Sequence, residues 1–86
     1  MRRTTREHDL IQTWAEARGA RPARVRGSAV LRLAFDRLPP NWEAISWEQF
    51  FEMFEQGGLE LWYEDAAGSR ICKLSKGVQA GRLRPG

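Results

Sequence analysis

Residues 45–59 read ISWEQFFEMFEQGGL, and this stretch decides how the rest of the chain is interpreted. Ser46 followed by Gln49 fits a capping box, in which the serine oxygen accepts a backbone N–H of the first helical turn. One apolar stripe at helical spacing is formed by Trp47, Phe50, Phe51 and Phe54. Gly57 and Gly58 then favour the end of the helix. We therefore expect an amphipathic helix whose aromatic side faces the core.

The other side of this helix carries a column of acids, Glu48, Glu52 and Glu55. Like charges four residues apart destabilise a helix by about 0.2–0.5 kcal/mol, and no Lys or Arg occurs between residues 38 and 69 to relieve them. An acid in the first turn suits the helix dipole, which explains Glu48 but not the other two. The pattern predicts an exposed row of carboxylates.

Charge is segregated along the whole chain of 86 residues, whose net charge is +3. Residues 1–37 are basic, residues 38–69 contain seven acids and no Lys or Arg, and residues 70–86 contain five basic residues and no acid. Such segregation predicts either two faces with different partners or pairing of opposite charges within the chain.

The N-terminal part predicts one helix and two strands. We expect the helix to run from Thr4 to Gly19, because Thr4 and Glu7 fit a second capping box and Gly19 suits the helix end. Residues 20–27, ARPARVRG, hold three arginines around a proline, which predicts an edge strand or an ordered loop. Residues 28–36 alternate as a strand.

The C-terminal part predicts a β-hairpin of residues 59–65 and 70–76, with Gly68 in its turn. Trp62 falls on the same side of its strand as two glutamates. It either packs under Ile71 across the hairpin or stays exposed beside the acids.

These elements predict an α+β two-layer domain over residues 1–76, with a three-stranded antiparallel sheet and two helices on one face. Residues 77–86 lack periodicity and are predicted to be a flexible basic tail.

Several functional classes are disfavoured by composition. The single cysteine, Cys72, forms no disulfide within the chain, and with one histidine, His8, it provides neither a zinc site nor a catalytic triad. No phosphate-binding loop or dinucleotide fingerprint occurs. We expect no enzyme activity, no metal and no cofactor. Neither a signal peptide nor a membrane span is evident, so we expect a cytoplasmic protein.

The chain resembles a group of small bacterial proteins of unestablished function. Its stretches TTREHD, WAEARGARPARV and ISWEQFFEMF resemble the patterns T-T-x-H-D, W-A-E-x-R-G-x-x-P-A-x-V and I-S-W-x-x-F-F-x-x-F of that group, over roughly residues 4–75. Many such proteins carry the label "1,4-alpha-glucan branching enzyme". We reject that label here, because such an enzyme needs a barrel of about 250 residues with paired carboxylates at its mouth.

The first functional hypothesis is a protein-binding module that docks an acidic helix face on a basic partner surface. Its predicted contact residues are Glu43, Glu48, Glu52, Glu55, Trp42 and Met53. A nucleic-acid-binding complex is one kind of partner that offers such a basic surface. Small phage or mobile-element inhibitors of bacterial defence, the anti-CRISPR proteins among them, are similar in size and charge.

The alternative hypothesis is a nucleic-acid-binding protein. Its predicted contact residues are Arg18, Arg21, Arg24, Arg26, Lys76, Arg82 and Arg84. Basic side chains of this kind give salt-dependent binding to phosphates. For the chain itself we expect a monomer or a weak homodimer, the latter pairing one chain's acidic block with another's basic ends.

Overall fold

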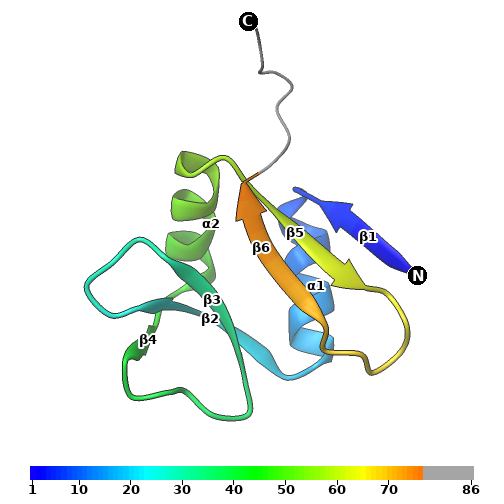
Figure 1. The fold of residues 1–86 in the computed structure, drawn as a ribbon, viewed down its shortest axis with the longest axis horizontal. Coiled ribbons are helices and arrows are strands. Elements are labelled where there is room, and N and C mark those ends of the chain that lie inside the picture. The colour runs from blue at the N-terminus through cyan, green and yellow to red at the C-terminus, as the bar shows by residue number, and fades with distance from the viewer. Residues whose placement is uncertain (77–86) are drawn as a thin grey trace, which may run out of the picture.

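The computed structural model describes residues 1–76, so the expected basic tail at residues 77–86 lies outside the described residues. The elements in chain order are β1 (Arg2–Thr5), α1 (His8–Ala17), β2 (Ala20–Val25), β3 (Leu31–Phe35), β4 (Trp42–Ala44), α2 (Trp47–Gln56), β5 (Leu59–Glu64) and β6 (Cys72–Lys76). The strands form two antiparallel sheets, and in Figure 1 α1 is seen behind β5 and α2 behind β3. The predicted α+β class is confirmed, with two three-stranded sheets in place of one.

Sheet A has the order β1-β5-β6, with β5 in the centre. The first helix was expected to begin at Thr4, but residues 2–5 pair antiparallel with β5, so that Thr4 lies opposite Trp62. The predicted helix start and its capping box are therefore wrong: α1 begins at His8, and Thr5 Oγ1 accepts the N–H of Glu7 at 3.0 Å. β-branched threonines favour a strand where an unpaired sheet edge is available.

Sheet B has the order β3-β2-β4, which places the arginine-rich strand β2 in the centre and corrects the prediction of an edge strand. A central proline is tolerated because of the register. The N–H of Val25 donates to Val30 O on the β3 side. Because hydrogen-bonding groups alternate in direction along a strand, the backbone N and O of Pro22 point to the other side, toward β4. Pro22 O accepts the N–H of Ile45 at 3.1 Å, beyond the end of β4. The proline N therefore faces the side of β4, just past the last residue of that short strand, and its missing N–H removes no bond of the β2–β3 ladder.

The core lies between the helices and the two sheets. As predicted, α2 begins at its Ser46 cap, whose Oγ accepts the N–H of Gln49 at 3.0 Å, and buries its phenylalanines. The buried cluster comprises Ile11, Trp14, Ala15, Ala20, Leu31, Leu33, Phe50, Phe51, Phe54, Leu61 and Tyr63. Gly19 has a φ of +76°, in the left-handed region that suits its predicted place at the end of the first helix.

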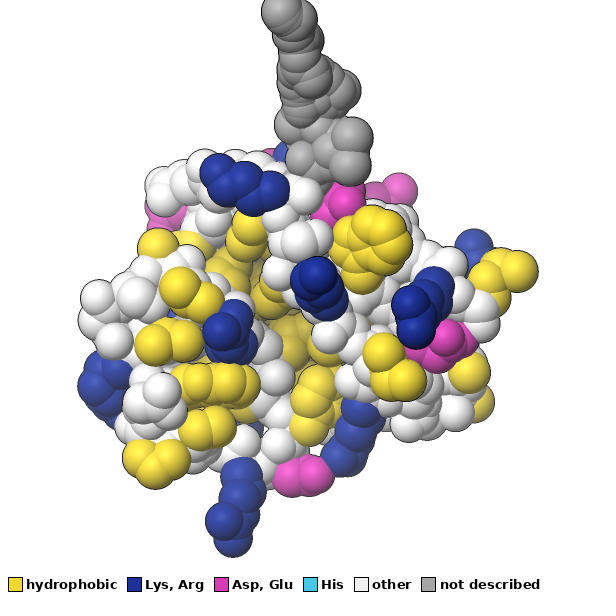
Figure 2. All heavy atoms as spheres, in the orientation of Figure 1, with side chains coloured by type: hydrophobic (Ala, Val, Ile, Leu, Met, Phe, Trp, Pro, Cys, Tyr) yellow, Lys and Arg dark blue, Asp and Glu magenta, His cyan; other side chains and the backbone are white. Residues whose placement is uncertain are grey.

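The fold sorts charge by layer. Within residues 1–76, the two helices carry five carboxylates and no Lys or Arg. The six strands of the same part of the chain carry seven Lys or Arg residues and three glutamates. Figure 2 views the molecule from the strand side, where cationic side chains stand among hydrophobic ones. The helices therefore form an acidic layer and the strands a basic one, but this division does not follow the charge blocks of the sequence, because α1 lies in the basic block and β4 and β5 lie in the acidic block.

Candidate binding surfaces

The predicted acidic column lies on the outer side of α2. Glu48, Glu52 and Glu55 are all exposed and are called the acidic face below. Within residues 1–76, Glu48 and Glu52 have no ion-pair partner, whereas Glu55 Oε2 lies 2.7 Å from His8 Nε2. The sequence pattern predicted three carboxylates without a partner; in the structure Glu48 and Glu52 have none within residues 1–76, and Glu55 meets the His8 ring.

His8 belongs to this surface. Its ring is stacked on that of Phe51, with centroids 4.2 Å apart and planes at 6°. Together with the acidic face, Ser46 and Gln49, these two rings line a shallow depression over α2. Sequence reasoning assigned His8 no role in this surface, because its contact with Glu55 joins residues 47 positions apart.

The other predicted protein-contact residues lie elsewhere. Glu43 is on β4, where it forms ion pairs with Arg24 and, at 3.4 Å, with Arg26. Trp42 sits under the guanidinium of Arg32, 5.7 Å from the ring centroid. Met53 is half-buried and packs against the core. The structure therefore brings together three of the six predicted residues.

Arg18, predicted to bind nucleic acid, instead makes contacts within the molecule. Its Nε donates to Ser69 O at 2.5 Å and its Nη2 to Ala66 O at 2.9 Å. Its guanidinium also lies 4.6 Å from the ring centroid of Trp14. These contacts tie the β5–β6 loop to the end of α1 and leave little of the group for a phosphate.

The remaining predicted basic residues do not form one free cluster. Arg24 and Arg26 share Glu43, while Arg21 and Lys76 are exposed and have no carboxylate partner in the described part of the chain. Arg82 and Arg84 lie outside the described residues.

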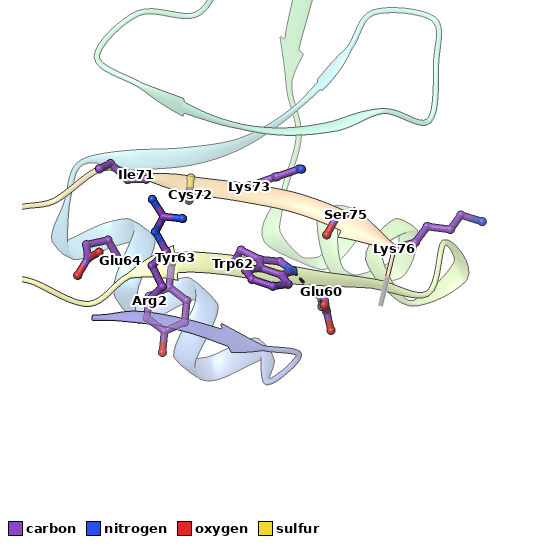
Figure 3. A pocket seen from close by; sticks show the side chains of 10 residues that line it. All are labelled: Arg2, Glu60, Trp62, Tyr63, Glu64, Ile71, Cys72, Lys73, Ser75 and Lys76. Atoms are coloured by element: carbon purple, nitrogen blue, oxygen red, sulfur yellow. Dashed lines mark hydrogen bonds between the residues drawn. The ribbon is translucent and has the colours of Figure 1, made fainter. Parts of the chain in front are cut away.

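Sequence reasoning missed a surface around Trp62, which is 44 % exposed on the outer face of sheet A. Of the two alternatives for this residue, the exposed one holds, because Trp62 pairs with Lys73 across the hairpin and Ile71, itself 63 % exposed, does not cover it. A hollow of about 430 Å³ adjoins Trp62 and is lined by residues of β1, β5 and β6 and by Ile71 (Figure 3). An indole on the polar side of a strand was the available signal, but the contribution of β1 was hidden by the mistaken helix start.

The remaining features bear on a reactive thiol, a metal site and a membrane span. Burial raises the pKa of the Cys72 thiol, which disfavours a reactive thiolate. Among residues 1–76, no group of three or more His, Cys, Asp or Glu side chains is placed to hold a metal ion. Over the same residues, neither helix has the length and hydropathy needed to cross a bilayer. No protein-family model, curated protein or solved structure matches the chain.

Proposed function

We propose that this protein is a non-catalytic binding module that docks the acidic face of α2 on a basic surface of a partner protein. The observation that carries the proposal is the exposure of Glu48 and Glu52 without a cationic partner in residues 1–76. Uncompensated like charges on one helix weaken the fold slightly, so a role in recognition is the simplest reason for their presence.

The helix layer is suited to this role as a rigid surface. The Ser46 cap and three buried phenylalanines hold α2 in place, so its carboxylates are presented without ordering a loop. A single-sign surface attracts an oppositely charged partner and accelerates its association. Partners with large basic surfaces include nucleic-acid-binding complexes, and an inhibitor of the anti-CRISPR kind acts by occupying such a surface.

The test is an affinity capture from nuclease-treated bacterial lysate with matched charge reversals. The variant E48K/E52K reverses two carboxylates of the acidic face. The control variant D9K/E16K changes the net charge equally on α1, where both acids are also exposed. Circular dichroism verifies that each variant is folded.

We expect the wild type and the control to retain the same basic protein, and E48K/E52K to lose it by about tenfold or more, because reversed charges repel the partner. Equal retention by both variants, or equal loss, would contradict a docking role for α2.

A further inference from the structure

Trp62 is the most exposed tryptophan of the domain. Trp14 is buried, and Trp42 and Trp47 are half-buried, whereas 44 % of Trp62 is accessible. A domain of this size needs its large apolar side chains for the core. Ile71, 63 % exposed, extends the apolar surface beside it. An exposed apolar patch with polar surroundings is characteristic of a binding site.

The indole is held in place on the outer face of sheet A. Its Nε1–H donates to Glu60 Oε2 at 3.0 Å, and Figure 3 shows the ring lying along β5 beside that carboxylate. The bond satisfies the one polar atom of the indole, so the remaining exposed surface of Trp62 is aromatic. Tryptophan fixed in this manner offers a stacking surface at small entropic cost.

Two cations flank the ring on the same face. Lys73 on β6 lies directly opposite Trp62, a relation that brings Cβ atoms to about 4.5–5.5 Å. Arg2 on β1 lies opposite Glu64 and is thus a diagonal neighbour of Trp62, at about 7–8 Å. Neither has a carboxylate partner within residues 1–76, and both line the hollow with Trp62 (Figure 3).

Of the two acids on this face, Glu64 is neutralised by the amino group of Met1, which donates to it. Glu60 accepts from the uncharged indole N–H and keeps its charge. Arg2 and Lys73 outnumber this one carboxylate, so the net charge beside the ring is positive, the opposite of the acidic face on α2.

From these relations we propose that the outer face of sheet A binds single-stranded nucleic acid, with a base stacked on Trp62 and neighbouring phosphates held by Arg2 and Lys73. Proteins bind single strands by combining aromatic stacking surfaces with cations that follow the backbone. Duplex bases are already stacked and do not offer a face to the indole, and an acidic peptide has the charge but not the flat ring that this surface fits.

The inference goes beyond the proposed function and does not depend on it, because the residues lie on the opposite layer. It also differs from the nucleic-acid hypothesis drawn from the arginine cluster of β2, whose side chains are largely paired within the molecule.

The test uses the full chain and fluorescein-labelled oligothymidylate of 20 nucleotides, with binding followed by anisotropy at several salt concentrations. We expect W62F to bind like the wild type, and W62L to bind about 5- to 150-fold more weakly, since stacking on one aromatic side chain accounts for that range. K73A should make the salt dependence shallower by about 0.7, the contribution of one phosphate contact on a single strand. R21A, which removes an exposed arginine of sheet B, serves as the matched control and should change neither quantity.

Three outcomes would overturn the inference. The first is absence of binding at low salt. The second is binding that W62L leaves unchanged but R82A/R84A abolishes, which would assign the interaction to residues 77–86. The third is equal or tighter binding of a duplex of the same length, or of poly-glutamate with the same dependence on Trp62, since the surface would then not select single strands. Circular dichroism of W62L is expected to match the wild type because the side chain is exposed.

Discussion

The imidazole of His8 lies parallel to the phenyl ring of Phe51, 4.2 Å between centroids, while its Nε2 meets Glu55 Oε2 at 2.7 Å. One side chain in the first turn of α1 thus contacts both the apolar and the acidic sides of α2. It closes the edge of the core over Phe51 and at the same time determines how many carboxylates of the acidic face remain free.

Replacing His8 separates these two roles. H8A should lower the free energy of unfolding by about 1–2 kcal/mol, because it removes an aromatic pair and a hydrogen bond. H8F keeps the stacking and should lose less. Urea denaturation of both variants measures the difference, and a loss in H8F equal to that in H8A would show that the stacking contributes nothing.

The Ser46 cap provides a second quantitative test. Its Oγ accepts the N–H of Gln49 at 3.0 Å, so S46A should lower the free energy of unfolding by about 1 kcal/mol. S46D should restore most of it, since aspartate also caps a helix and its charge suits the dipole. S75A on β6 is the control for loss of a hydroxyl. An S46A effect no larger than that of S75A would argue against the cap.

The second helix could be predicted from sequence because its signals are local. The Ser46 cap, the phenylalanine stripe and the terminal glycines all lie within residues 46–58, and each acts on the backbone nearby. Residues 2–5 are different. They are a strand because β5, some sixty residues away, offers an edge, and the sequence near Thr4 contains no trace of that pairing. The central position of β2 was hidden for the same reason, since β4 contributes only three residues.

The residues of the candidate site divide in the same way, into features set by local sequence and features set by the pairing of distant strands. The exposure of Glu48 and Glu52 follows from helical periodicity, whereas the pairing of Glu43 with Arg24 depends on the β2–β4 register. That register determines which charges are neutralised, and composition cannot supply it. The Trp62 surface needed β1, β5 and β6 together, so it became visible only in the folded chain.

Arg18 should act in stability and not in nucleic-acid binding. R18A removes charge-assisted bonds to Ser69 O and Ala66 O and the contact with Trp14, so we expect the free energy of unfolding to fall by about 1.5–3 kcal/mol. R21A, an exposed arginine without a carboxylate partner in residues 1–76, should stay within about 0.5 kcal/mol of the wild type. Equal effects of the two substitutions in urea denaturation would refute the structural role of Arg18.

Acid should loosen the attachment of β1 through Asp65. Arg3 on β1 donates to this carboxylate and, together with the amino group of Met1, holds the pKa of Asp65 below its ordinary value of 3.8. Because the pKa is lower in the folded than in the unfolded chain, the ionised carboxylate stabilises the fold above its ordinary pKa. That contribution is lost as the pH falls below about 3.8 and through the folded-state pKa.

Two measurements check this pH dependence. Amide hydrogen exchange of residues 2–5 should be faster in D65N than in the wild type at about pH 5, and the difference should shrink as the pH is lowered below 3.8 and Asp65 of the wild type is protonated, once rates are corrected for intrinsic exchange. E48Q, which removes a carboxylate without an ion-pair partner in the described chain, reports the effect of lost charge alone. If D65N and wild type differ as much at the lower pH as at the higher, the Arg3–Asp65 pair does not hold β1 on the sheet. Since Arg2 is carried by the same strand, weaker binding of oligothymidylate by D65N at neutral pH would further link the anchoring of β1 to the Trp62 surface.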